Sequence, residues 1–130
     1  MSRVVVDASA LAAIAFDEPA GVAVARRLDG ATVFAPTLLK CEMANTAWKK
    51  ARRQRSDAEK ILRALALFLS PRWGIVWREI DLVDVVLIAD ATGLSAYDAS
   101  YLWLAGSLGA DLVTLDTRLA HASAALGEYQ

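Results

Sequence analysis

Four acidic residues stand where hydrophobic segments end or where helices are expected to begin. Asp7 follows three valines, Asp116 closes the run LVTLD, and Glu42 and Asp98 lie near the starts of helical segments. In a parallel α/β fold, strand ends and helix starts share one edge of the sheet, so acids far apart in sequence can meet there. Two carboxylates about 4 Å apart repel each other by roughly 4 kcal/mol at an effective dielectric of about 20. A fold that gathers four carboxylates must therefore bind a divalent cation or protonate some of them, and this predicts a metal-dependent phosphoryl-transfer site.

The scarcity of cysteine and histidine restricts the kind of metal. The chain has one cysteine, Cys41, and one histidine, His121. These exclude an internal disulfide and any cysteine-based zinc site. A metal must then be held by oxygen, which indicates Mg²⁺ or Mn²⁺.

Length and hydrophobicity indicate one globular domain over residues 1–130. The hydrophobic fraction is 56%, above the usual level of about 45–50%. No stretch approaches the roughly 20 apolar residues of a membrane span, and the first residues lack the long apolar region of a signal peptide. We therefore expect a cytoplasmic protein without a membrane segment. The apolar excess favours a surface buried in a homodimer or against a partner.

Basic side chains are concentrated in one part of a chain whose net charge is only −1. The basic residues expected to contact RNA are Lys49, Lys50, Arg52, Arg53 and Arg55. A basic lobe beside an acidic pocket suits a polyanionic substrate that is cut at a metal. Taken alone, such a run more often marks a solvated helix face.

Strand and helix patterns alternate along the chain, which predicts a three-layer α/β fold with a short, mostly parallel sheet of four to five strands flanked by helices. The expected strands are Arg3–Val6, Ala31–Ala35, Ile75–Ile80 and Leu112–Leu115. The expected helices are Ala10–Ala15, Ala20–Leu28, Thr37–Arg53, Ala58–Leu69, Asp81–Thr92, Ser95–Gly109 and Thr117–Leu126. Glu128, Tyr129 and Gln130 would add a strand fragment at most.

Each acid on its own also has a structural explanation. Asp7 is a suitable N-cap for the helix that follows it. Ser95 and Asp98 have the spacing of a capping box, and Glu42 has polar neighbours on its helix that permit a surface role. Thr37 is expected to cap the helix that carries Glu42. Cys41 is expected to be a buried packing residue.

Four segments, in this order, resemble the PIN-domain nucleases and in particular the VapC-type toxins of bacterial and archaeal toxin–antitoxin pairs. They read VVVDASAL, PTLLKCEMANTAWKKA, LSAYDASYLWLA and LVTLDTRLA, and together they span nearly the whole chain. The resemblance implies a small parallel sheet flanked by helices and a Mg²⁺- or Mn²⁺-dependent ribonuclease site. It carries the roles of catalytic residue and metal ligand to Asp7, Glu42, Asp98 and Asp116, and a supporting hydroxyl role to Ser9.

The same resemblance implies partners. RNA would be the substrate, and a VapB-type antitoxin protein and a second copy of the chain would bind the helix pair from Thr37 to Leu69. Members of the family often end in a clear fifth strand, whereas this sequence offers little beyond Leu126, so the corresponding edge of the sheet is expected to be short.

The sequence therefore predicts endonucleolytic cleavage of RNA, with one unspecified carboxylate as the general base. Two alternatives remain open within the family, a PIN nuclease outside toxin biology and a non-catalytic PIN-like binding module. A phosphoacceptor receiver domain is a further alternative, but such domains use a lysine late in the chain and this sequence has none after Lys60. Dinucleotide-binding, P-loop and nucleophile-elbow motifs are absent from the sequence.

Overall fold

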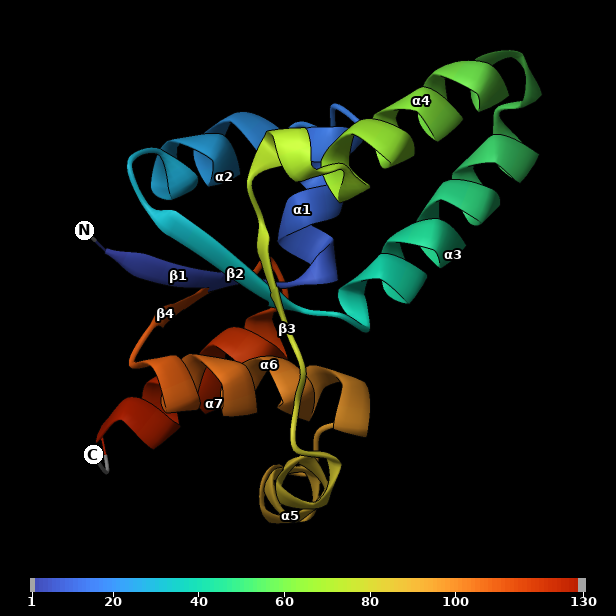
Figure 1. The fold of residues 1–130 in the computed structure, drawn as a ribbon. Helices are drawn as coiled ribbons and strands as arrows, with labels where there is room; N and C mark the ends of the chain where they lie inside the picture. The colour runs from blue at the N-terminus through green and yellow to red at the C-terminus, as the bar shows by residue number, and fades with distance from the viewer. Residues whose placement is uncertain (1, 129–130) are drawn as a thin grey trace.

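Four short strands form one fully parallel sheet in the order β3-β2-β1-β4 (Figure 1). The computed structural model describes residues 2–128. Its strands are β1 (Arg3–Val6), β2 (Thr32–Pro36), β3 (Val76–Arg78) and β4 (Asp111–Val113). The predicted parallel α/β fold is confirmed, with four strands in the described part of the chain.

Helices cover both faces of this sheet. They are α1 (Ala8–Ala15), α2 (Gly21–Leu28), α3 (Leu39–Arg53), α4 (Ala58–Leu69), α5 (Leu82–Thr92), α6 (Ala96–Leu108) and α7 (Thr117–Glu128). Short 3-10 turns at Arg55–Asp57 and Pro71–Trp73 precede α4 and β3. Figure 1 shows α1 and α2 on one side of the strands and α6 and α7 on the other, which gives the three predicted layers.

The core lies on both faces of β1. Val5 and Val6 are completely buried, with α1 packed on one side and α6 on the other. Because both faces are covered, the strand reads as an unbroken run of valines without alternating polar residues. Leu11 of α1 and Leu104 of α6 contribute to the same cluster.

Helices α1 and α2 approach so closely that only glycine fits at the start of α2. A Cβ atom on Gly21 would lie 2.4 Å from the carbonyl oxygen of Ala13. Glycine at this position therefore allows α1 and α2 to pack as one layer over β1. This packing holds α1, whose N-cap is Asp7, in place.

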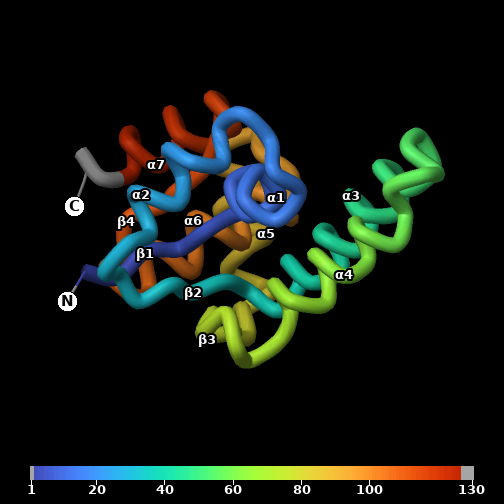
Figure 2. The backbone as a smooth tube through the Cα atoms, turned by 90° about the horizontal axis from the view of Figure 1, so that it is seen from above, coloured from blue at the N-terminus to red at the C-terminus, as the bar shows by residue number. Residues whose placement is uncertain are grey.

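Helices α3 and α4 form a hairpin that projects from the rest of the molecule (Figures 1 and 2). The apolar residues Leu39, Met43, Ala47 and Ala51 recur at four-residue spacing along α3; the first three are fully buried, whereas Ala51 is half-buried. Cys41 is exposed, so its prediction as a packing residue is wrong. It lies two residues from Leu39, which places it about 200° around the helix from the buried row.

The start of α3 differs from the prediction. Thr37 does not cap this helix, which begins at Leu39 without a side-chain cap. The backbone N–H of Thr37 instead donates to the carbonyl of Arg78 at 3.0 Å, which extends the pairing of β2 with β3 by one residue. Thr37 therefore pairs with the end of β3, although the sequence pattern predicts it as the first residue of the helix.

The end of the chain also differs from the prediction. Glu128 belongs to α7 and not to a strand fragment, while Tyr129 and Gln130 lie outside the described residues. Within residues 2–128, no helix has the length and apolar character needed to cross a membrane.

Candidate active site

The strand order creates a switch point between β1 and β4. From β1 the chain adds β2 and β3 on one side, whereas β4 pairs with the other side of β1. In open parallel sheets, ligands bind beyond the carboxyl ends of the strands at such a point. Asp7 directly follows β1, and Asp116 follows β4 after a short connection. The backbone N–H of Asp7 donates to the carbonyl of Val113 at 3.3 Å, which joins the two strand ends.

The Asp7 carboxylate is held by hydrogen bonds to both of its oxygens. Oδ1 accepts from the Ser9 hydroxyl at 2.8 Å and from the Ala10 backbone N–H at 3.0 Å, and Oδ2 accepts from the Thr114 hydroxyl at 2.5 Å. Asp7 is only 4% exposed. It is both the N-cap of α1 and an acid at the strand end, so the structural and functional explanations of this residue are compatible.

Thr114 connects the first acid to the last, a role that the sequence prediction missed. Its hydroxyl donates to Asp7 and accepts from the backbone N–H of Asp116 at 3.0 Å. Ser9 makes a parallel bridge, because its hydroxyl donates to Asp7 and accepts from the Leu115 N–H at 3.0 Å. The Ser9 and Thr114 hydroxyl oxygens lie 3.4 Å apart. Because both hydroxyl protons are donated to Asp7, this contact is not a hydrogen bond. A polar residue inside the apolar run LVTLD was the available sequence signal.

Glu42 reaches the site from the first turn of α3. It lies between the buried residues Leu39 and Met43 and is itself half-buried. Its Oε1 accepts a hydrogen bond of 2.6 Å from the hydroxyl of Tyr101, a residue of α6 that the sequence prediction also missed. The carboxylate therefore lies where α3 meets α6.

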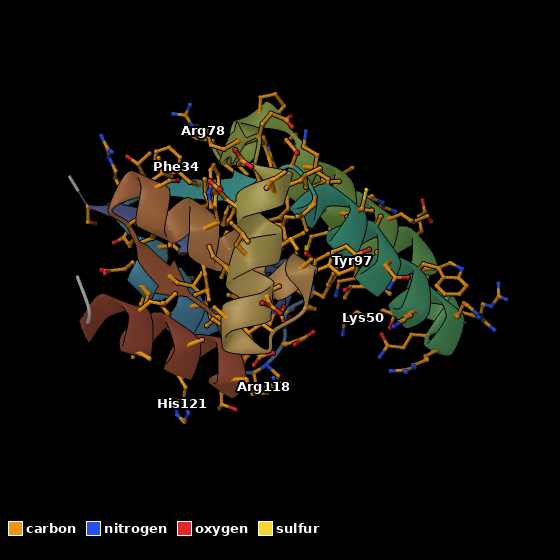
Figure 3. All side chains as sticks on the ribbon, turned by 90° about the horizontal axis from the view of Figure 1, so that it is seen from below. Phe34, Lys50, Arg78, Tyr97, Arg118 and His121 are labelled. Carbon is orange, nitrogen blue, oxygen red and sulfur yellow. The ribbon has the colours of Figure 1, made fainter. Side chains whose placement is uncertain are left out.

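Asp98 lies in the first turn of α6. Its backbone N–H donates to the Ser95 hydroxyl at 3.1 Å, which confirms the predicted cap. The Asp98 side chain is half-buried. Arg118 of α7 is the basic side chain near it; its guanidinium donates to the carbonyl of Gly93 at 3.2 Å. In Figure 3, Arg118 and Tyr97 lie on the α6–α7 side of the molecule, while Lys50 lies on the projecting hairpin.

Asp116 is the most exposed of the four acids. Its Oδ1 accepts from the backbone N–H of Leu119 at 3.1 Å, as an N-cap does at the start of α7. The positive end of the α7 dipole stabilises a negative charge at this position.

The pKa shifts of three of the acids have burial and the charges of other acids among their causes. Burial raises the pKa of Asp7, and the charge of Asp116 raises it further against the opposing effect of three hydrogen bonds. Burial likewise raises the pKa of Glu42, to which the charges of Asp98 and Asp7 add. The pKa of Asp98 is raised by burial and then by Asp116 and Asp7. Each acid is thus within the field of others that come from distant segments.

The donor set fits a hard divalent cation through its chemistry. All four side chains offer carboxylate oxygen, which suits Mg²⁺ or Mn²⁺. Within residues 2–128, no group of three or more acidic, histidine or cysteine side chains lies in an arrangement that could hold a metal ion. Mg²⁺ commonly keeps several water ligands and uses only one or two carboxylates directly, so an open arrangement still suits it. His121 is exposed on α7 and points away from the body of the protein (Figure 3).

The predicted RNA-contacting residues occupy the outer half of α3 and the following turn. Lys49, Arg52, Arg53 and Arg55 are exposed. Lys50 differs from them, because it is half-buried and forms a 3.0 Å ion pair with Glu18. Lys50 is therefore the least suitable of the five for binding phosphate.

One cleft of the protein lies away from the acids. It has a volume of about 830 Å³ and lies between α6, β4 and α7. Only Thr114 connects its lining to the acidic site, and much of the remaining lining consists of small and apolar residues such as Ala105, Gly106 and Ala124.

Comparisons with known proteins agree with this geometry. A family model described as PIN domain matches residues 4–125. Similar proteins include ribonuclease VapC3 of Pyrobaculum aerophilum, which is 34% identical over 128 residues that cover 95% of this chain and 97% of the relative. Ribonuclease VapC12 of Mycobacterium tuberculosis is 35% identical over 123 residues, which cover 90% of this chain and 89% of that protein.

A solved structure supports the same relationship. The crystal structure of PAE2754 from Pyrobaculum aerophilum superposes with a TM-score of 0.73 at 32% sequence identity. The match covers 94% of this chain and 86% of that one. The similarity therefore includes the sheet and the four acidic segments together.

Proposed function

Because this chain belongs to the PIN-domain family and is related over most of its length to VapC ribonucleases, we propose that it is a Mg²⁺- or Mn²⁺-dependent endoribonuclease. The observation that supports this most strongly is the position of Asp7 and Asp116 at the switch point of the sheet, together with the electrostatic effect of these two acids and Asp98 on one another and on Glu42. Three of them have a raised pKa, for which burial and the charges of the other acids are causes. A bound divalent cation would relieve this repulsion and keep the carboxylates ionised.

Asp7, Glu42, Asp98 and Asp116 would hold the ion, directly or through water. When bound, a divalent ion supplies Lewis-acid stabilisation of the negative charge that develops on the phosphoryl oxygens. Asp7 would be the most rigid of the ligands, because both of its oxygens are already fixed by hydrogen bonds.

A raised pKa also suits proton transfer near neutral pH. Asp7, Glu42 and Asp98 each have this property. One of them would accept the proton of the attacking water molecule. The positive end of the α7 dipole and Arg118, whose charge lowers the pKa of Asp98, would favour a phosphate charge near this acid.

Basic side chains of the hairpin would hold the RNA backbone away from the point of cleavage. Arg52, Arg53 and Arg55 are exposed at its outer end, with Lys49 one turn nearer to the site. Contacts of this kind bind phosphates and carry little sequence information. The preference for a cleavage sequence would then come from residues nearer to the acids.

We further propose that the protein acts in the cytoplasm as the toxin of a type II toxin–antitoxin pair. This follows from the resemblance of its four segments to VapC-type toxins, for which a VapB-type antitoxin is the partner. The exposed apolar side chains of the α3–α4 hairpin, among them Trp48 and Leu62, offer a surface to such a protein.

A homodimer is the second proposed assembly. Helix α5 presents four exposed apolar side chains on one face, which are Leu82, Val83, Val86 and Leu87. Residues with this spacing are neighbours on a helix surface. Burying the same face on both copies would give a closed, two-fold contact.

The experiment is incubation of the purified protein with a panel of structured RNAs and Mn²⁺ or Mg²⁺. We expect discrete cleavage products that disappear when EDTA is added and return with excess Mn²⁺. Asp7→Asn should abolish cleavage and retain the fold by circular dichroism. RNA binding without cleavage under all metal conditions would assign the chain to the non-catalytic alternative, and cleavage by Asp7→Asn at the wild-type rate would remove Asp7 from the mechanism.

A further inference from the structure

Tyr101 joins the two helices that carry Glu42 and Asp98. It lies on α6 and is 1% exposed, and it is among the largest fully buried side chains of the described residues. Its hydroxyl donates to Glu42 Oε1 at 2.6 Å, across 59 positions of sequence. A hydroxyl-to-carboxylate bond of this length is charge-assisted and stronger than a bond between neutral groups.

The spacing on α6 makes this contact part of the acidic site. Asp98 and Tyr101 are three residues apart, so they lie on the same face of the helix. One turn of α6 thus provides an acid of the site and a donor to a second acid. In the part of the chain that the structure describes, the Tyr101 hydroxyl is the hydrogen-bond donor to the side-chain carboxylate of Glu42.

The hydrogen bond from Tyr101 matters more for the orientation of the Glu42 carboxylate than for the stability of the fold. Its side chain has three rotatable bonds, and the charges of Asp98 and Asp7 repel it. The attachment of α3 and α6 to the core is provided separately, by Leu39 and Met43 on one helix and by Leu104 on the other. Removing one hydroxyl would therefore release the carboxylate while leaving the hydrophobic packing in place.

We propose that Tyr101 is a positioning residue that fixes Glu42 through Oε1, so that Oε2 remains available to a divalent ion. This inference rests on the proposed metal-dependent function. It follows a pattern already present at Asp7, whose oxygens are oriented by the hydroxyls of Ser9 and Thr114. Groups that orient metal ligands in this way typically contribute about 10- to 100-fold in metal affinity or activity.

The direct test is Tyr101→Phe, which removes only the hydroxyl. We expect Mn²⁺ affinity, measured by calorimetry on the RNA-free protein, to fall about 10-fold or more. The kcat for RNA cleavage should fall as well, while the KM for RNA stays within twofold. Tyr97→Phe is the matched control, because Tyr97 lies one turn earlier on the same helix and is 66% exposed (Figure 3). It should bind Mn²⁺ as the wild type does.

A second pair of variants distinguishes action through Glu42 from a general loosening of the core. In a Glu42→Gln background, Tyr101→Phe should cause no further loss of Mn²⁺ affinity, because the carboxylate that it positions is already gone. An equal loss in both backgrounds would overturn the proposal, and so would a Tyr101→Phe protein with wild-type Mn²⁺ affinity and kcat. If the wild type itself neither binds Mn²⁺ nor cleaves RNA, the proposed function fails first and this inference fails with it.

Discussion

Single side chains at this site serve two purposes at once. Asp7 caps α1 and is the acid at the end of β1, and Asp116 caps α7 and follows β4. A helix N-terminus stabilises a carboxylate, which offsets part of the cost of gathering negative charges. The protein can therefore keep repelling acids at one edge of the sheet by using them as caps.

Replacing Asp7 by Asn is expected to raise the free energy of unfolding at neutral pH in the absence of metal. Burial raises the pKa of Asp7 in the folded protein. Protonation of Asp7 therefore stabilises the folded protein. This contribution to the free energy of unfolding is complete below the pKa of Asp7 in the unfolded chain, and it is lost as the pH rises through the pKa of Asp7 in the folded protein. At neutral pH the wild type thus carries a buried charge that the variant lacks.

Urea unfolding in EDTA, at neutral and mildly acidic pH, measures this difference. The gap between Asp7→Asn and the wild type should be widest at neutral pH and should shrink on acidification. Asp90→Asn, at an exposed position of α5, is the control and should follow the wild type. Equal stability of wild type and Asp7→Asn at neutral pH would contradict the account.

Thr114 should matter through its hydroxyl and not through its volume. Its bond to Asp7 lowers the pKa of that acid, and the same oxygen accepts from the Asp116 N–H. Thr114→Val removes both interactions, so we expect single-turnover RNA cleavage to slow about 10-fold or more. Thr114→Ser keeps the hydroxyl and should retain most of the rate. Equal rates for the two variants would show that Thr114 only fills space.

At the scale of elements, α3 carries a proposed metal ligand near its start and proposed RNA-binding residues near its end. Glu42 lies in its first turn and Arg53 at its last residue. Eleven residues at about 1.5 Å each place them roughly 16 Å apart along the helix. Arginines at the outer end would therefore contact RNA away from the point of cleavage.

Neutralising the outer end of the hairpin should therefore weaken RNA binding without changing the chemical step. For Arg53→Gln with Arg55→Gln, we expect KM to rise and the slope of log KM against log salt to become shallower by about 1.4, at roughly 0.7 per phosphate contact. The single-turnover rate at saturating RNA should stay the same. Arg26→Gln with Arg27→Gln on α2 is the matched control. A changed rate with an unchanged salt slope would place these arginines outside the RNA path.

Local patterns predicted the elements well wherever hydrophobic periodicity and strand ends decide the structure. The valine run predicted strand β1. The four-residue spacing of Leu39, Met43 and Ala47 indicated the face of α3 that is buried. The positions of Asp7 and Asp116 followed from the shared edge of parallel strands. The role proposed for Glu42 had no such local basis and came from the resemblance to a family.

Long-range hydrogen bonds were not predictable from the sequence. Thr114 and Tyr101 donate to acids 107 and 59 positions away; the polar position of Thr114 in the run LVTLD could have drawn attention to it, but neither residue type indicates its partner. Thr37 was predicted as a cap from its residue type. Its actual partner, the carbonyl of Arg78, lies far along the chain and could not be identified from local sequence. In each case, the partner is set by tertiary contact and not by spacing.

At the scale of the whole molecule, helix α5 has an apolar face that is exposed to solvent in the described chain. Leu82, Val83, Val86 and Leu87 on α5 are between 59% and 71% exposed. Such a face on a short helix favours contact with a second copy.

We expect the protein to sediment as a dimer and Val83→Lys with Val86→Lys to sediment as a monomer. Two buried lysines facing two others would repel each other and lose hydration. Val22→Lys on α2 changes a residue that is 64% exposed and should leave the dimer intact. A wild-type monomer at all concentrations, or a dimer unaffected by the α5 substitutions, would show that α5 is not the interface.

The central claim is that four distant acids share one divalent ion, and anomalous scattering from crystals grown with Mn²⁺ tests it most directly. The account predicts an anomalous peak bounded by Asp7, Glu42, Asp98 and Asp116. Density at Mn²⁺ concentrations that support RNA cleavage should disappear in crystals of Asp7→Asn. An empty site under those conditions, or a peak elsewhere on the protein, would contradict the claim.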